Sequence, residues 1–122
     1  MEVSREHVEY WRRRQAEHSA LCEALARQAR SDLRAVVERL VQRYGATRVI
    51  LFGSLARGRF SPGSDIDLAL EGIEKARFFE ALADVNSLSH AWVDLKPLEA
   101  LDPYFRKRVM ETGECLYVSD DR

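Results

Sequence analysis

The first third of the chain places apolar side chains at the period of an α-helix. Between residues 4 and 44, such positions recur at spacings of three, four and their sums. They are Val8, Trp11, His18, Cys22, Leu25, Ala29, Val36, Leu40 and Tyr44. Because Ser31 or Asp32 can cap a new helix, we predict one helix over residues 4–29 and a second over residues 32–44, before Gly45.

Shorter runs follow, and their patterns alternate between those of strands and helices. Residues 47–52 are apolar and partly β-branched, as in a strand buried on both faces. The predicted strands are residues 47–52, 65–70, 91–95 and 115–118, and the predicted helices are residues 74–88 and 103–112. The pattern therefore predicts a helical extension over residues 1–30 and one α/β core domain over residues 31–122.

Size and charge narrow the class of protein. The chain has 122 residues, of which 46% are hydrophobic and 32% charged, as is normal for one globular domain. Its net charge is −1, whereas nucleic-acid-binding domains are usually strongly basic. The basic run 12–14 follows Tyr10 and Trp11, but interspersed glutamates favour a solvated face over an RNA contact. We therefore expect no nucleic-acid partner.

The cysteines and the N-terminus bear on the cellular compartment. Cys22 and Cys115 are the only cysteines, and neither belongs to a CxxC motif or a Cys/His cluster. The N-terminus is charged and lacks the apolar stretch of a signal peptide. No apolar run approaches the roughly 20 residues that span a bilayer. We expect a cytoplasmic protein without a zinc site, a disulfide framework or a membrane anchor.

Two aspartates separated by one residue are the first candidates for chemistry. Asp65 and Asp67 lie at positions i and i+2 of a predicted strand, so they project from the same face. Two carboxylates this close repel each other unless a cation or a proton lies between them. Mg²⁺ takes oxygen ligands and leaves positions open for phosphate oxygens. The alternative is an exposed strand face that carries two aspartates and binds nothing, and the pair alone does not decide.

A glycine and a serine directly follow the predicted strand 47–52. Gly53 lets backbone N–H groups approach a phosphate closely, and the hydroxyl of Ser54 can donate a hydrogen bond to it. The alternative is an ordinary turn in which Ser54 caps the helical turn that follows. Without the aspartates, the ordinary turn is the better explanation.

A third carboxylate lies on the predicted strand 91–95. Asp94 alternates with Val93 and Leu95, which we expect to face the core, so it projects from the opposite face. If this strand neighbours residues 65–70, three carboxylates converge. Phosphoryl and nucleotidyl transfer use such clusters to hold metal and to accept the proton of the acceptor. The alternative is a solvated aspartate near a strand end.

Together these residues resemble the signature of a known family. Gly53-Ser54, ten intervening residues and Asp65-Ile66-Asp67 match the GSx₁₀DxD pattern of the DNA polymerase beta-like nucleotidyltransferase superfamily. The chain is similar to its minimal nucleotidyltransferase (MNT) family from about Leu33 to Val118. This resemblance implies a nucleotidyltransferase fold of the α/β (α+β) type, with a small mixed sheet of about four strands flanked by helices.

The resemblance also implies an activity and a role for each candidate residue. The implied activity is a Mg²⁺-dependent transfer of a nucleotidyl group, AMP from ATP, to a hydroxyl acceptor. The implied triphosphate-binding turn is Gly53 and Ser54, and the implied metal-binding and catalytic residues are Asp65, Asp67 and Asp94. Of these, Asp94 would deprotonate the acceptor or complete a second metal site. Arg57 is a further candidate for a phosphate contact, and its alternative is a solvated arginine on a short helical turn.

A partner is implied in the same way. MNT proteins similar to this one are often encoded beside a HEPN-domain ribonuclease, which they neutralise as antitoxins by adenylylating a tyrosine. We therefore expect a HEPN toxin as the acceptor. The competing hypothesis is a non-catalytic antitoxin that blocks its partner sterically and carries a vestigial nucleotide site. We favour the enzyme because the glycine–serine turn and all three carboxylates are present.

The apolar stripe of the extension, from Val8 to Ala29, lies outside this resemblance. It is too apolar for a helix that stands alone in water. It either folds back on the core or forms an interface with a partner or with a second copy of the chain. We expect the interface.

Overall fold

A four-stranded sheet and three helices make up the chain in this computed structural model, which describes residues 4–120. The strands are β1 (Arg48–Phe52), β2 (Ile66–Glu71), β3 (Val93–Pro97) and β4 (Glu114–Val118). The helices are α1 (Arg5–Gln42), α2 (Phe78–Asn86) and α3 (Pro103–Thr112), with short 3₁₀ turns at Lys75–Arg77 and Leu98–Ala100. The four strands and the two later helices lie within a few residues of their predicted positions.

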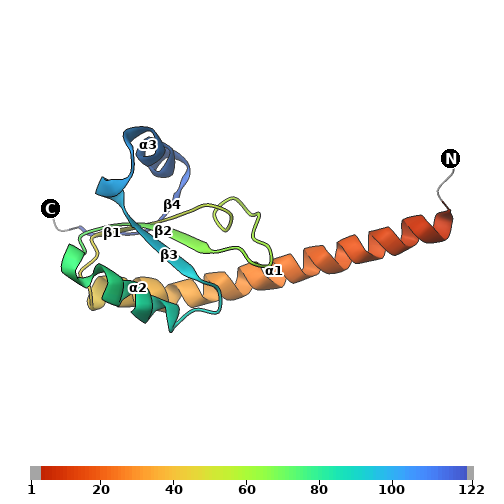
Figure 1. The fold of residues 1–122 in the computed structure, drawn as a ribbon, viewed down its shortest axis with the longest axis horizontal. Coiled ribbons are helices and arrows are strands. Elements are labelled where there is room, and N and C mark those ends of the chain that lie inside the picture. The colour runs from red at the N-terminus through yellow and green to blue at the C-terminus, as the bar shows by residue number, and fades with distance from the viewer. Residues whose placement is uncertain (1–3, 121–122) are drawn as a thin grey trace.

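The sheet is mixed, with the strand order β3-β2-β1-β4. Strand β1 pairs antiparallel with both β2 and β4, whereas β2 and β3 run parallel. A parallel pair needs a crossover, and α2 supplies it. Helices α1 and α2 cover one face of the sheet and α3 lies over the other (Figure 1). The predicted mixed sheet flanked by helices is confirmed.

Alternation along the strands divides the core between the two faces of the sheet. The main cluster joins apolar residues of α1 to one face of the sheet, including Val36, Leu40, Leu51, Ile66 and Leu68. A smaller cluster, Ile50, Ala69, Leu98 and Val109, lies on the α3 side. The middle of β1 is therefore buried on both faces, as its apolar sequence predicts.

Helix α1 is one continuous helix of 38 residues, so the predicted break at residues 31 and 32 is wrong. The observed cap is Ser4, whose side chain accepts a hydrogen bond from the backbone of His7 at 3.2 Å. Asp32 instead accepts hydrogen bonds from Gln28 of the same helix and from the backbone N–H of His90 at 2.9 Å. Burial alone would raise the pKa of Asp32, but these hydrogen bonds lower it below its ordinary value.

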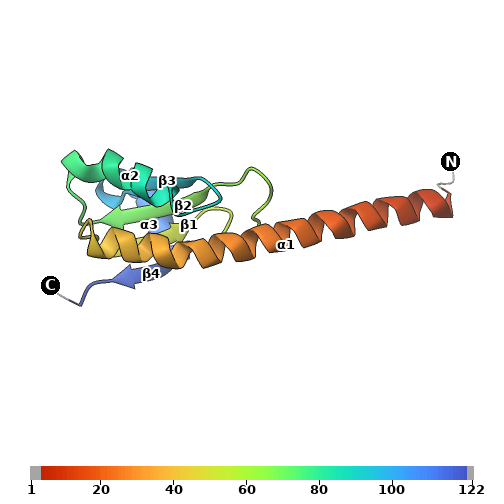
Figure 2. The same ribbon diagram turned by 90° about the horizontal axis from the view of Figure 1, so that it is seen from below.

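The N-terminal half of α1 projects away from the rest of the molecule (Figures 1 and 2). Residues 4–21 are all exposed, and Ala29 is the first fully buried residue of the helix. The outer part of the apolar stripe, up to residue 21, therefore does not fold back on the core, whereas Leu25 and Ala29 at its inner end pack against it. No helix among residues 4–120 is both long and apolar enough to cross a membrane.

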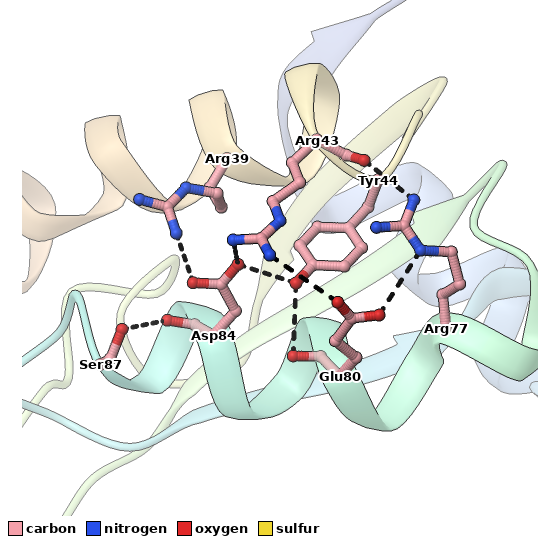
Figure 3. Close-up of polar contacts among 7 residues, drawn as sticks. All are labelled: Arg39, Arg43, Tyr44, Arg77, Glu80, Asp84 and Ser87. Carbon is pink, nitrogen blue, oxygen red and sulfur yellow. Dashed lines mark hydrogen bonds and ion pairs between the residues drawn. The ribbon is translucent and has the colours of Figure 1, made fainter.

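A polar network joins the C-terminal end of α1 to α2 (Figure 3). Its centre is Asp84, which is largely buried and forms ion pairs with Arg39 and Arg43. The hydroxyl of Tyr44 donates a hydrogen bond of 2.7 Å to the same carboxylate. Burial and this carboxylate together raise the pKa of Tyr44. Glu80 lies at the exposed rim of the network, 3.6 Å from Arg77 and 3.8 Å from Arg43.

An Asp84→Ala variant is expected to lower the free energy of unfolding by about 2 kcal/mol, because it removes the shared acceptor of three donors. Urea unfolding followed by circular dichroism would measure the change. Glu80→Ala, on the same helix but at the exposed rim, is the matched control and should change stability by less than about 0.5 kcal/mol. Equal effects of the two substitutions would contradict a central role for Asp84.

Candidate active site

Three aspartates converge on the face of the sheet opposite α1 and α2. Asp65 directly precedes β2, and Asp67 is the second residue of that strand, so both project from one face. Asp67 is the register partner of Asp94 on the parallel strand β3, which places Asp94 on the same face. The core residues Ile66 and Leu68 point the other way, into the cluster beneath α1. Strands β2 and β3 are thus neighbours, which is the condition on which the convergence of the three carboxylates depends.

The charges of the three carboxylates act on one another. Partial burial raises the pKa of Asp67, and the negative charges of Asp94 and Asp65 raise it further. The positive charge of Lys96 acts in the opposite direction and lowers the pKa of Asp67. Its ammonium also lies 3.4 Å from a carboxylate oxygen of Asp94. One lysine against three carboxylates leaves an excess of negative charge, which favours a cation at this face of the sheet.

Gly53 follows β1 and lies against the central aspartate. Its φ angle is +79°, in the region that glycine adopts at little cost. A Cβ atom at this position would lie 2.2 Å from the Oδ2 atom of Asp67, far inside van der Waals contact. The chain therefore needs glycine here for two independent reasons, the backbone conformation and the close approach of the Asp67 side chain.

The segment after Gly53 forms a tight turn rather than a helix. The N–H of Arg57 donates to the carbonyl of Gly53 at 3.1 Å, and that of Arg59 donates to the carbonyl of Ser54 at 2.8 Å. Within residues 4–120, the Ser54 hydroxyl makes no hydrogen bond, so it does not cap this turn. Its side chain is partly exposed and can donate to a ligand.

Two arginines border a small pocket beside the glycine turn. The pocket has a volume of about 30 Å³, and its lining includes Gly53, Arg57 of the turn and Arg108 of α3. Both arginine side chains are exposed, and in the described part of the chain neither forms an ion pair. Arg57 was a sequence candidate, whereas Arg108 was not, because only the packing of α3 against β1 brings it here. Two guanidinium groups beside a glycine turn suit an anion such as a phosphate.

The donor set fits Mg²⁺, although it is not a ready-made cage. Among the described residues, no group of three or more His, Cys, Asp or Glu side chains is close enough together to enclose a metal ion. Mg²⁺ does not require one, since it is usually held by one or two carboxylates together with water and substrate phosphates. Asp65 and Asp67, with Asp94 beside them, provide such an open set of oxygen ligands.

A wider groove begins at the edge of this site. It has a volume of about 460 Å³ and lies between α1 and two loops, residues 60–65 and 90–92. Leu25 and Ala29 line it from the helix, Trp92 from the loop before β3, and Asp65 at its border with the carboxylates. Asp65 thus belongs both to the candidate site and to the lining of the groove.

Comparison with known families identifies the class of protein. The family model described as "Polymerase beta, Nucleotidyltransferase" matches residues 36–122. The chain belongs to this nucleotidyltransferase family, as the resemblance of its glycine–serine and aspartate motifs implies. The match leaves out the projecting part of α1.

Several solved structures are similar to this chain. A minimal nucleotidyltransferase is 31% identical, with a TM-score of 0.63, over 72% of this chain and 92% of that chain. A toxin–antitoxin structure with AMP-PNP is 22% identical, with a TM-score of 0.60, over 70% and 73% of the two chains. The MntA–HepT toxin–antitoxin structure is 19% identical, with a TM-score of 0.57, over 74% and 73%. A comparison with curated protein sequences gives no match.

Proposed function

We propose that this chain is a Mg²⁺-dependent nucleotidyltransferase that transfers AMP from ATP to a hydroxyl group of a partner protein. One observation carries the proposal. Asp65, Asp67 and Asp94 lie on one face of the sheet, and Gly53 packs directly against the central carboxylate. A phosphate-binding turn and a cation site are thereby in contact, as the transfer of a nucleotidyl group requires.

Each residue has a task in the transfer. The N–H groups of the turn after Gly53, the Ser54 hydroxyl and Arg57 would hold the β- and γ-phosphates, with Arg108 as an additional cation. Mg²⁺, held by Asp65 and Asp67, would neutralise charge on the triphosphate and polarise the α-phosphate.

The third carboxylate completes the chemistry. The acceptor oxygen forms a bond to the α-phosphorus, and the bond from that phosphorus to the bridging oxygen breaks, so pyrophosphate leaves. Asp94 would accept the proton of the acceptor hydroxyl, or ligate a second metal. Lys96 would orient the Asp94 carboxylate, since its ammonium lies 3.4 Å from one of the carboxylate oxygens.

The proposed acceptor is a tyrosine of a HEPN-type toxin, which makes this chain an antitoxin of the cytoplasm. Support comes from two of the similar structures, both of which are toxin–antitoxin structures. The first of these contains the ATP analogue AMP-PNP. A steric, non-catalytic antitoxin is the competing proposal. The close approach of Gly53 to the Asp67 carboxylate would have no task in a purely steric blocker.

Incubation with Mg²⁺ and ATP labelled on the α-phosphate is expected to transfer label to the protein encoded by the adjacent gene. Gel electrophoresis would detect the label, and mass spectrometry would place it on one side chain. Asp65→Asn is expected to lower the labelling by at least about a hundredfold, because one of two proposed metal ligands loses its charge. Glu74→Gln, an exposed residue outside the site, is the control and should label normally.

Two outcomes would separate the competing proposals. Label on the partner that disappears in Asp65→Asn establishes the enzyme and identifies its acceptor. A stable complex without label, with each of the four nucleotides, overturns the proposed transfer and leaves the steric antitoxin. Label from another nucleotide alone would correct the nucleotide and keep the reaction.

A further inference from the structure

We propose that the projecting half of α1 pairs with the same segment of a second copy of this chain, as an antiparallel two-helix coiled coil. This part of the chain lies outside the family match, which begins at residue 36. The pairing does not depend on whether the chain transfers nucleotides. Val8 and Trp11 are 37% and 58% exposed on this segment, although they continue the stripe that further along the helix enters the core.

The stripe follows a heptad pattern along the whole helix. Its members alternate spacings of three and four residues, at Val8, Trp11, Gln15, His18, Cys22, Leu25 and Ala29. From Ala29 onward the chain's own sheet covers this face of α1. Before Cys22 nothing among the described residues covers it. The outer part of the stripe therefore has the pattern of a coiled-coil seam and lacks a partner helix.

The fold decides the orientation of the second helix. In a parallel pair, the two globular bodies would lie side by side at the same end of the seam. The globular body lies beside the C-terminal half of α1 (Figures 1 and 2) and covers the seam face of its own helix from Ala29 onward, so the two bodies of a parallel pair would overlap in space. An antiparallel pair places the bodies at opposite ends, where neither obstructs the other. Such a pair has the closed two-fold symmetry that is usual for dimers.

The pattern of apolar and polar seam residues then decides the register. With the two-fold axis between residues 16 and 17, the facing pairs are Val8 with Leu25, Trp11 with Cys22 and Gln15 with His18. Apolar residues face apolar ones, and the two polar residues face each other at the centre. A shift of one heptad in one direction would place Trp11 opposite Gln15 and Val8 opposite His18, with fewer facing pairs. A shift in the other direction would place Gln15 opposite Leu25 and Trp11 opposite Ala29, which is already buried in its own chain.

The charges of the segment favour the same arrangement. Residues 4–14 carry four arginines and two glutamates, whereas residues 19–29, which face them in this register, carry one arginine and one glutamate. An antiparallel pair therefore places the basic half of each helix beside a neutral half of the other. A parallel pair would place the two basic halves together, which is unfavourable.

This register also fills the groove beside the candidate site. The first turn of the second copy, residues 4–8, would lie opposite residues 25–29 of α1. Leu25, Gln28 and Ala29 line one wall of the groove of about 460 Å³. The second copy would therefore enter this groove and reach the loop that ends at Asp65.

Crosslinking can identify both the orientation and the register. In a chain that carries Trp11→Cys and Cys115→Ser, a short bismaleimide is expected to join position 11 of one copy to Cys22 of the other. Within one helix these positions are about 16 Å apart, beyond the reach of the reagent. Peptide mass spectrometry would identify the linked positions. The chain with Cys115→Ser alone should give no crosslinked dimer, because the two Cys22 residues would also lie about 16 Å apart.

Sedimentation provides a second measurement that needs no introduced thiol. The natural chain is expected to change from monomer to dimer between about 1 and 100 µM. Trp11→Glu should raise the dissociation constant at least about tenfold, because it places a charge in the seam. Ala20→Glu introduces the same charge on the opposite face of the helix and should leave the dimer intact. Both substitutions lie outside the globular body, so the fold is not at risk.

The proposal can fail in three ways. A monomer at every concentration overturns the pairing. A link between the two Cys22 residues, with none between positions 11 and 22, overturns the antiparallel orientation. A dimer that Trp11→Glu and Ala20→Glu weaken equally shows that the seam is elsewhere.

Discussion

An Asp67→Asn variant is expected to keep its fold and to lose nucleotidyl transfer by about three orders of magnitude or more. Asp67 lies between the other two carboxylates and touches the glycine turn, so it links the proposed metal site to the proposed phosphate site. Removing a metal-binding charge from such a centre costs about 4 kcal/mol of transition-state stabilisation, which corresponds to this factor. Initial rates of label transfer to the partner protein at saturating ATP and Mg²⁺ would measure it.

The control for this prediction is a carboxylate outside the site. Glu99 is exposed in the turn that follows β3, and Glu99→Gln should transfer label at nearly the natural rate. If Asp67→Asn retained more than about a tenth of the activity, Asp67 would not be a metal ligand. The Asp67→Asn variant should also bind ATP more weakly than the natural chain in the presence of Mg²⁺, because the metal and the triphosphate are bound together.

The same substitution is expected to make the protein more stable when Mg²⁺ is absent. Burial and two neighbouring carboxylates raise the pKa of Asp67 in the folded state, so its ionised form destabilises the fold at neutral pH. That destabilisation disappears as the pH falls through the raised pKa towards the ordinary value of 3.8. Asp67→Asn should therefore raise the free energy of unfolding at pH 7 and change it little near pH 3.8. Urea unfolding at the two pH values would test the sign.

Gly53→Ala is expected to impair both stability and activity. A methyl group at this position meets the Oδ2 atom of Asp67 at 2.2 Å, and the φ of +79° is unfavourable for alanine. The conformation costs about 1–2 kcal/mol, and displacement of the Asp67 side chain adds to it. Because the displaced carboxylate can no longer meet a phosphate held by the turn, transfer should fall at least about a hundredfold. Thermal unfolding and the label-transfer rate would measure the two effects.

Gly45→Ala is a control that separates the effect of the positive φ from the effect of the steric clash with Asp67. Gly45 has a similar φ of +76°, but a Cβ there would meet nothing within 4 Å. It lies at the end of α1, away from the carboxylates, so Gly45→Ala should destabilise by about 1 kcal/mol and leave transfer unchanged. If Gly53→Ala and Gly45→Ala had the same effects on thermal unfolding and on the label-transfer rate, the contact of Gly53 with Asp67 would not contribute to activity.

Local patterns predict most of this fold, and they fail where a tertiary contact decides. The strands follow from apolar runs that are bounded by turn residues, and the start of α3 follows from Asp102, which accepts from the backbone of Phe105 at 3.0 Å. The break predicted at Ser31 and Asp32 is wrong because a capping residue is also tolerated inside a helix when its side chain finds another donor. That donor, the backbone of His90, is 58 residues away in the sequence.

In the candidate site, too, some features follow from the spacing of residues and others depend on tertiary packing. The spacing of Asp65 and Asp67 places both on one strand face, and the sequence predicts Gly53 at the preceding turn. The approach of Arg108 depends on how α3 packs on β1, which no spacing in the sequence expresses. Lys96 and Asp94 lie two residues apart on one strand, so their spacing alone places both side chains on the same face and predicts their contact. The functional roles of all these residues stay predictions until the variants are measured.

The continuity of α1 bears on how its outer half can be helical at all. A separate helix of the outer residues would have to form its first turn alone in water, which is unfavourable for so short a segment. The inner half, packed on the sheet through Leu33, Val36 and Leu40, provides a turn that is already formed, and the helix extends outward from it one hydrogen bond at a time. If the inner helix began at Ser31, the residues before it would form a disordered tail. Because α1 is unbroken, the outer seam is already helical before a partner binds.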